Sequence, residues 1–592
     1  MLYMISVHRE ECNWEGTEQL RFNNIYEEKV MKSFSENKNE IDNIIFHIVQ
    51  LIIYIFACNL LVASTLFIFG KTISWSTLII SSFVATILLA IFYGENIHNT
   101  IIIELVCTVI LIVLLTCVIE QIYDFSWDGN SYHKLAVGLL KNHWNPLKEL
   151  PTLELTEGIG NYSNGATLWC EAYCKVTWIF AAALYALTGN IECGKVYTIL
   201  GMMCAFGLVF YFLRKKGMKL SCSFALAICA GFNPIALQQM LSFYIDGFLQ
   251  TILLMLIVAL LMLEDKEKFN SKISASLVAA LMIICGNIKF TGLLYGGIFC
   301  IVYYLWDCYK LLKTKEDWIR PVVEEGALYF LLATITICWA GSSTYLTNYV
   351  RHNTFTYPLT GNEKVDIMTN NSPFFEENHF KNLFISLFSK MGNSIHGNGK
   401  IELKIPFTVD WKTESYVIGN VDNRISGFGI LFSGIIIISL VILIWSIVKN
   451  KSKLVILNLI TCVGLTIGIK ESWWARYAPY IYFIALLAIF VALSDKRKWL
   501  NIIGYILVVI VIINNSISCI MIKSQYEKSK EVTKNIEELR IYEPIKVYNK
   551  DFEGVYFNFK DKKINYSVDS TVVNELNVRV LEYVGETLWE KY

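Results

Sequence analysis

Charged residues are scarce in this 592-residue chain: they make up 17% of it, whereas soluble domains carry about 25%. Apolar residue types make up 55%, and the mean hydropathy is +0.46. The net charge is zero, because 51 basic residues balance 51 acidic ones. This composition excludes a single soluble globular domain, a disordered protein and a nucleic-acid-binding protein. Since neither sign of charge is in excess, the distribution of charge along the chain carries the information.

The apolar residues are gathered into long blocks. The block at 44–69 contains no Asp, Glu, Lys or Arg, and about 20 helical residues suffice to cross the roughly 30 Å hydrocarbon layer. Because lipid offers backbone groups no hydrogen-bond partner, each block should be a helix. Thirteen blocks are predicted, centred near residues 57, 83, 110, 204, 230, 253, 281, 302, 336, 437, 461, 485 and 510. We therefore expect an all-α polytopic membrane protein with about 13 transmembrane helices.

Basic residues at alternate turns predict the orientation, because positive residues in short loops stay on the cytoplasmic side. Five turns are basic, namely 214–219, 266–272, 310–320, 449–453 and 496–498, and the segments between them hold few basic residues. This pattern predicts a multi-pass protein of the cell membrane with a cytoplasmic N-terminus. It also places both long polar loops, 121–193 and 346–425, on the outer face.

The first outer loop contains a candidate general base. Residues 123–134 read Tyr-Asp-Phe-Ser-Trp-Asp-Gly-Asn-Ser-Tyr-His-Lys, and leucines at helical spacing follow. Asp128 and Tyr132 are four residues apart and would share one face of a short helix. A carboxylate, a tyrosine and His133 within six residues suit general-base chemistry. The alternative is that Asp128 only caps that helix.

Further charges lie at the outer ends of predicted spans, where they are costly. Asp246 begins one span and Lys289 ends another, while Glu471 and Arg476 flank a tryptophan pair. Ionisable residues at membrane depth usually pair or line a cavity. Because all four lie at the rim that carries the long loops, they predict a shared polar cavity. Snorkelling or simple ion pairing is the alternative for each residue alone.

This arrangement resembles the GT-C superfamily of integral-membrane glycosyltransferases, which use lipid-linked sugars. The resemblance covers roughly residues 100–490, and the order and side of four features carry it. These are the acidic motif at Asp128 after an early span, a surface helix at 175–187 followed by Thr-Gly-Asn-Ile-Glu, the pair Asn233-Pro234 with Tyr244-Ile-Asp246 around an outer turn, and Ala-Arg-Tyr-Ala-Pro at 475–479. It implies a GT-C-type bundle with long outer loops and a small outer C-terminal tail.

The resemblance implies inverting transfer of a sugar from a polyprenyl-phosphate donor to a cell-envelope glycan, lipid or protein acceptor, with membrane lipid and no nucleic acid as partner. Asp128 is then the first candidate for the base and Asp124 the second, with His133 orienting the base or the acceptor. The leaving phosphate needs fixed cations. Arg476 suits it best, because a guanidinium binds two phosphate oxygens at once, and Lys289 and Lys175 come next.

Substrate contacts are expected from both outer loops and from the rim. They are Tyr132, Asp246 and Glu471, together with Arg351, His352 and Tyr357 of a sugar-binding lid in the second loop. An ordinary folded loop is the alternative for this lid. We expect no cofactor. A divalent metal would need Asp124, Asp128 and another acid to converge, and we expect none, because hard cations want several oxygen ligands and the sequence offers no Asp-x-Asp pair.

The chain is predicted to divide into six parts. These are a loosely structured cytoplasmic tail (1–43), two transmembrane helices (44–93), a catalytic membrane core with the first outer loop (94–345), the second outer loop (346–425), C-terminal transmembrane helices (426–521) and a small outer domain (522–592) with strands near 555–559 and 564–568. Residues 168–187 are apolar but charged at Glu171 and Lys175. We expect this segment to lie flat on the outer membrane surface, with its aromatic rings, including Trp178, at the interface.

Two other function classes fit part of the pattern. A polysaccharide polymerase or ligase with a lipid-linked donor relies on Arg and His in outer loops, which Arg351 and His352 would supply. A transporter or flippase should show paired, interrupted helices in two related halves and polar residues near the midplane. Here the polar residues gather at the outer rim, which favours the glycosyltransferase.

Overall fold

The computed structural model describes residues 16–94, 100–151, 164–314, 317–362, 364–374, 378–395, 400–450, 452–549, 551–574, 579–584 and 586–591. Most of these residues are helical, and one small sheet lies near the C-terminal end of the described chain.

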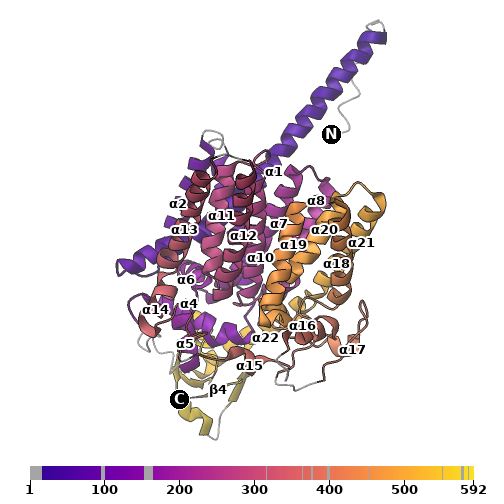
Figure 1. Ribbon diagram of the computed structural model, residues 1–592. Coiled ribbons are helices and arrows are strands. Elements are labelled where there is room, and N and C mark those ends of the chain that lie inside the picture. The colour runs from indigo at the N-terminus through magenta and orange to yellow at the C-terminus, as the bar shows by residue number, and fades with distance from the viewer. Residues whose placement is uncertain are drawn as a thin grey trace.

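The body of the molecule is a bundle of apolar helices (Figure 1). Nine stretches in the described residues are long and apolar enough to cross a membrane. They are Glu40–Ile68 within α1 (Gly16–Ile68), α2 (Trp75–Tyr93), α3 (Ile101–Ile119), Ile191–Lys215 with α7 (Tyr197–Lys215), α10 (Asp246–Glu264), α12 (Phe290–Thr314), Ile319–Ala340 with α13 (Ile319–Thr334), Phe432–Lys449 within α18 (Phe432–Asn450), and Lys498–Tyr542, which joins α21 (Lys498–Ile517) to α22 (Met521–Leu539).

The four remaining predicted blocks form shorter apolar helices of 12 to 16 residues. They are α8 (Leu220–Gly231), α11 (Ser271–Gly286), α19 (Lys453–Gly468) and α20 (Pro479–Ser494). The helical character of every predicted block is therefore confirmed, and the number of thirteen spans stays a prediction.

The outer helices expose their apolar side chains. The apolar window of α10 is 89% buried, whereas that of α3 is 17% buried and that of Ile319–Ala340 is 6% buried. Exposed apolar area of this size is not stable in water. The bundle therefore suits a hydrocarbon environment.

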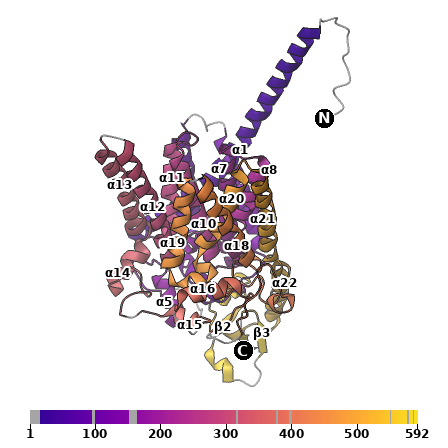
Figure 2. The same ribbon diagram turned by 45° about the vertical axis from the view of Figure 1, so that its right-hand side comes forward.

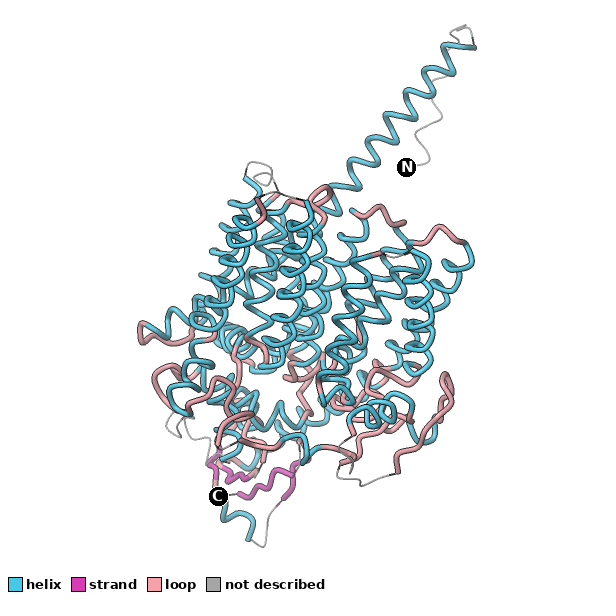
Figure 3. Tube along the Cα trace, in the orientation of Figure 1, coloured by secondary structure: helices cyan, strands magenta, loops and turns pink. Residues whose placement is uncertain are grey.

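The two long loops and the C-terminal segment meet at one end of the bundle, and the N-terminal part of α1 projects from the other end (Figures 1 and 2). This loop end carries α4 (Lys134–Lys141), α5 (Asn164–Ala172), α14 (Thr347–His352), α15 (Ile367–Asn371), α16 (His379–Phe388), α17 (Trp411–Glu414) and the strands. Figure 3 shows the strands and most of the longer loops gathered there.

The prediction of a loose tail up to residue 43 is wrong for its described part. α1 begins at Gly16 and continues without a break into the first apolar block. The sequence explains this, because no glycine or proline occurs between residues 17 and 69 and either type would weaken a helix interior. Residues 1–15 lie outside the described chain.

The segment 168–187 also differs from the prediction. It forms two helices, α5 and α6 (Val176–Thr188), with a break at 173–175. The 13 residues of α6 span only about 20 Å, and its residues Val176–Tyr185 are buried. Trp178 is fully buried in the protein, and its indole Nε1 donates to His133 Nδ1 at 2.7 Å. Its ring therefore packs inside the protein, and the depth of this segment in the membrane stays a prediction.

The C-terminal domain is a small sheet with one helix. β1 (Ile545–Tyr548), β2 (Tyr566–Val568), β3 (Arg579–Glu582) and β4 (Glu586–Lys591) form a sheet in the order β2-β1-β4-β3, with only β1 and β2 parallel. The predicted strand at 564–568 is found in part as β2. The predicted strand at 555–559 is instead α23 (Val555–Asp561), and all five residues are buried. A short run buried on all sides has no periodicity that separates helix from strand.

Site-directed labelling tests which end of the bundle faces the cytoplasm. Lys412 on α17 is exposed at the loop end, and Lys266, also exposed, follows α10 at the opposite end. In a variant without background cysteines, an impermeant thiol reagent should label Lys412→Cys in intact cells, since the charge pattern puts this end outside. Lys266→Cys should react only after permeabilisation. The reverse pattern would invert the orientation.

Candidate active site

A cavity of about 1280 Å³ opens at the loop end of the bundle. The first loop, the second loop and the turns near residues 289 and 476 all contribute to its wall. Its charged residues are Asp128, Lys289, Lys364, Asp366, Asp422, Arg424, Lys470, Glu471 and Arg476, its amides are Asn371, Asn393 and Asn420, and its aromatic residues include Tyr132, Trp169, Tyr173, Tyr244, Phe290, Tyr295 and Tyr477. Of the four rim charges expected to share a cavity, Lys289, Glu471 and Arg476 line it, whereas Asp246 is not among its lining residues. The cavity lies beside the apolar helices rather than in the middle of the bundle.

Asp128 faces this cavity from the first loop. It immediately precedes a short helical turn, Gly129–His133, but makes no side-chain capping hydrogen bond, so capping does not explain it. About a quarter of its side chain is exposed (25%), and Oδ2 lies 3.4 Å from Nη1 of Arg476. Burial raises the pKa of Asp128; the guanidinium of Arg476 opposes this, and the carboxylates of Asp422 and Asp246 reinforce it. An accessible carboxylate with a raised pKa suits proton abstraction.

Arg476 is surrounded by three carboxylates. Its guanidinium lies 3.3 Å from Asp422, 3.4 Å from Asp128 and 3.7 Å from Asp246, and its Cζ lies 4.3 Å from the centre of the Trp474 ring. The contact with Asp128 has hydrogen-bond geometry, whereas Nε faces Oδ1 of Asp422 at ion-pair distance without hydrogen-bond geometry. Glu471, on the other side of the tryptophan pair in sequence, lines the same cavity.

Lys289 supplies a second cation to the cavity wall. Its Nζ lies 2.7 Å from Oδ1 of Asp246 and 3.8 Å from the centre of the Tyr477 ring. Burial alone would lower the pKa of Lys289, but the carboxylate of Asp246 outweighs it and raises the pKa, so the ammonium stays charged. Asp246 is itself 3% exposed. It therefore acts as the partner of two cations more than as a direct substrate contact.

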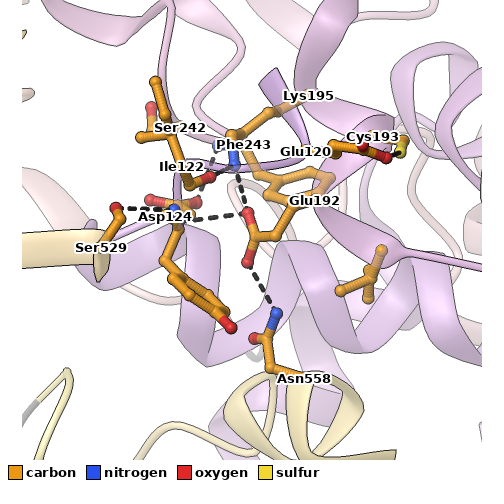
Figure 4. A network of polar contacts seen from close by, with 12 residues as sticks. Glu120, Ile122, Asp124, Glu192, Cys193, Lys195, Ser242, Phe243, Ser529 and Asn558 are labelled. Atoms are coloured by element: carbon orange, nitrogen blue, oxygen red, sulfur yellow. Dashed lines mark hydrogen bonds and ion pairs between the residues drawn. The ribbon is translucent and has the colours of Figure 1, made fainter. Parts of the chain in front are cut away.

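Asp124 does not line the cavity. Its carboxylate is fully buried. It accepts the backbone N–H of Phe243 at 2.8 Å (Figure 4) and that of Ser126 at 2.7 Å. A Cβ at Gly129 would lie 2.0 Å from this carboxylate, which explains the glycine after Asp128. Asp124 thus fixes the first loop to the start of α10, and the geometry does not support it as the second base.

Two further predicted residues lie behind the cavity wall. His133 is 1% exposed, and burial lowers its pKa to about 3, so the ring is neutral where it accepts from Trp178. Lys175 is 1% exposed and donates to the carbonyls of Glu171, Tyr173 and Ser343 at 2.8 to 3.0 Å; burial lowers its pKa to about 7. Neither lines the cavity, so a direct role in substrate binding is not supported.

The predicted lid residues form a separate cluster around Glu171 of α5. Arg351 Nη1 and His352 Nε2 both lie 3.2 Å from Oε1 of Glu171, and the His352 ring stacks on Tyr357 at 3.6 Å. These residues join the second loop to the first and do not line the cavity. The cavity wall instead receives other residues of the second loop, such as Lys364 and Asn371.

Five charged residues of the cavity wall were missed by the sequence analysis, namely Asp422, Arg424, Lys364, Asp366 and Lys470. Asp422 accepts the indole N–H of Trp474 at 2.8 Å, and Arg424 donates to Asn393 Oδ1 at 2.5 Å and Asn371 Oδ1 at 3.1 Å. Polar residues in a long loop are usually exposed, so composition did not single them out. For Asp422 and Arg424 the available signal was their position just before the apolar block at 432, at the same rim as the other charged residues.

Comparison with known proteins adds nothing to this geometry. No family model, curated protein or solved structure matches this chain.

The three aspartates around Arg476 are matched by three cations. The carboxylates of Asp128, Asp246 and Asp422 lie among the cations Arg476, Lys289 and Arg424. In the described residues no group of three His, Cys, Asp or Glu is arranged to hold a metal, because Arg476 occupies the space between the three aspartates. The arrangement offers a base, fixed cations for an anion, and aromatic faces beside an apolar bundle.

Proposed function

We propose that this protein is a membrane glycosyltransferase, which moves a sugar from a polyprenyl-phosphate donor to a glycan, lipid or protein acceptor on the outer face of the membrane. The observation that carries the proposal is the contact of Asp128 with Arg476 at the wall of the large cavity. It puts a carboxylate of raised pKa and a guanidinium side by side at the wall of one cavity.

In the proposed reaction, Asp128 takes the proton of an acceptor hydroxyl. The acceptor oxygen attacks the anomeric carbon, the bond from that carbon to the phosphate oxygen breaks, and the configuration is inverted. The polyprenyl phosphate leaves with the bonding electron pair, and its charge is stabilised by Arg476 and Lys289, which are fixed before the reaction begins. The aromatic rings of Tyr132, Tyr244 and Tyr477 offer flat faces to the sugar.

Donor binding must open the contact between Asp128 and Arg476. An incoming oxygen and a leaving oxygen approach opposite faces of the anomeric carbon, so a sugar ring has to lie between base and cation. The present separation of 3.4 Å leaves no room for it. In this proposal the ion pair belongs to the resting state, and the phosphate replaces Asp128 as the partner of Arg476.

The proposal is tested by transfer in vitro from radiolabelled polyprenyl-phosphate sugars to membrane extracts, with purified protein in detergent. Formation of a labelled product that requires the donor supports it. Release of label without an acceptor, or no turnover with any donor, contradicts it. The polymerase alternative has lost its main support, because Arg351 and His352 face Glu171 and not the cavity.

Transfer should depend on pH through Asp128. The base acts only when it is deprotonated, so kcat/KM should fall as the pH drops through its raised pKa, at a less acidic pH than for an ordinary aspartate. His133 does not titrate in this range, since burial lowers its pKa to about 3. The charged groups that face Asp128 are Arg476, Asp422, Asp246 and Lys289.

Asp422→Asn removes one of these charges and serves as the check. Without the neighbouring carboxylate, the pKa of Asp128 should fall, and the acid limb of the profile should move to lower pH. A shift to higher pH, or an acid limb identical to that of the unchanged protein, would assign the limb to another group.

A further inference from the structure

We infer that the C-terminal domain, 545–591, is a positioning element of the active site that holds the segment 123–134, and with it Asp128, in its working place. This inference rests on the proposed function for its catalytic consequence. The domain is far from this segment in sequence but packs directly on it, with ring and hydrogen-bond contacts along the whole segment.

The contacts begin on both sides of Asp128. Before it, the rings of Tyr123 and Phe125 lie 5.2 and 5.7 Å from the ring of Tyr583. The ring of Trp127, the residue directly preceding Asp128, lies 4.7 Å from that of Phe552. After it, the carbonyl of Asn130 accepts the backbone N–H of Gly554 at 2.8 Å.

The contacts continue into α4. A Cβ at Gly138 would lie 2.0 Å from the ring of Phe557, so α23 approaches α4 as closely as the backbone allows. Helix α22, which precedes the domain, adds one hydrogen bond: the hydroxyl of Ser529 accepts the backbone N–H of Tyr123 at 3.0 Å (Figure 4).

A buried ion network lies under these contacts. Glu192 is 1% exposed and pairs with Lys134 at 2.5 Å and with Lys195. Asn558 completes the network from the C-terminal domain. Its Nδ2 donates to Glu192 at 2.9 Å (Figure 4), and its Oδ1 accepts from Lys134 at 3.0 Å. The hydroxyl of Tyr583 accepts a third bond from Lys134 at 2.9 Å.

Such a network is sensitive to the loss of one member. Buried charges are stable only when their hydrogen bonds are satisfied, and removing one partner leaves the others unpaired. Glu192 also accepts the backbone N–H of Asp124 at 3.1 Å, so a change at Asn558 reaches the loop through one side chain. The domain makes no contact with Arg476 or Lys289 among the described contacts, so donor binding should be independent of it.

The test compares Asn558→Leu and Tyr583→Phe with a matched control, Tyr566→Phe. Leucine keeps the approximate size of Asn558 without its bonds, and phenylalanine keeps the ring of Tyr583 without its hydroxyl. Tyr566 belongs to the same domain, but its hydroxyl donates to Tyr556 inside that domain at 3.1 Å. Hydrogen exchange of the full-length protein in detergent reports on the amides of 126–134, and transfer assays report kcat and the affinity for undecaprenyl phosphate.

In the two test variants we expect exchange in 126–134 to be faster by roughly tenfold or more. We expect kcat to fall by about 10²-fold, as for a misplaced reacting group, with donor affinity unchanged. The control should match the unchanged protein in all three measurements.

Two results would overturn the inference: unchanged exchange in 126–134 in both variants, or faster exchange with an unchanged kcat. If the unchanged protein shows no sugar transfer at all, the proposed function fails, and the exchange measurement still decides whether the domain holds the loop.

Discussion

Replacing Asp128 by asparagine is expected to lower the rate of sugar transfer by about 10²- to 10⁴-fold, the usual contribution of a general base. Asparagine keeps the shape of the side chain but cannot accept the acceptor's proton at neutral pH. The helical turn after Asp128 should stay intact, because the carboxylate makes no capping bond to it. Turnover of a purified variant under saturating donor is the measurement.

Asp410→Asn is the matched control for this change. Asp410 pairs with Lys390 in the second loop at 2.8 Å and is not part of the cavity wall, so its loss should leave transfer unaffected. Near-normal turnover of Asp128→Asn, at normal expression, would remove Asp128 as the base. Undecaprenyl phosphate should still bind to that variant, since the proposed phosphate partners are unchanged.

The second large effect is expected on the affinity for the donor phosphate. Arg476→Lys keeps the charge near Asp128, Asp246 and Asp422 but loses the planar pair of donors. A lost hydrogen bond to a charged group costs about 1.5 to 3 kcal/mol, which corresponds to a roughly ten- to hundredfold weaker donor affinity. The shift of thermal unfolding with added undecaprenyl phosphate measures this affinity in detergent.

A structural role of Arg476 would give a different result. If the guanidinium only neutralises its three aspartates, the lysine variant should unfold at a lower temperature and yet respond normally to undecaprenyl phosphate. Arg320→Lys is the control, because Arg320 forms an exposed pair with Glu324 near the opposite end of the bundle. Unchanged affinity in both Arg476→Lys and Arg476→Ala would exclude the phosphate role and leave Lys289 as the leading candidate.

The helices were predictable from the sequence because a membrane-spanning helix is recognised by the average hydropathy of about 20 consecutive residues. An apolar block such as 44–69 needs no knowledge of its neighbours to be a helix in lipid. The first residue of this helix was not predictable. Helix α1 begins at Gly16, before the apolar block, in a polar segment where only the absence of glycine and proline favours a helix. The short run 555–559 failed for the opposite reason, because burial on all sides removes the periodicity on which a strand or helix assignment depends.

The site was predictable where a charge stands at a costly position. Asp246, Lys289 and Arg476 each lie at the end of an apolar block, whereas Asp128 was singled out by Tyr132 and His133 close to it in the sequence. The structure brings the four charges together. Lys175 stood at an equally costly position, but its donors are satisfied by backbone carbonyls, which leave no pattern in the sequence. Asp422 lies in a polar loop where a charge is unremarkable, so only the tertiary contact with Arg476 identifies it.

The distance in sequence between the first loop and its C-terminal partners sets an order of assembly. Lys134 and its partner Asn558 are separated by 424 positions. At a translation rate of about 5–20 residues per second, Asn558 is therefore synthesised roughly 20 to 85 s after Lys134. During that interval the segment with Asp128 lacks the domain that packs on it, although the apolar helices on either side can already enter the membrane. The contacts of the first loop are therefore completed late in the synthesis of the chain. A nascent chain that stalls before Asn558 already contains Asp128, Lys289 and Arg476 but lacks the side chain that joins Glu192 and Lys134 to the C-terminal domain.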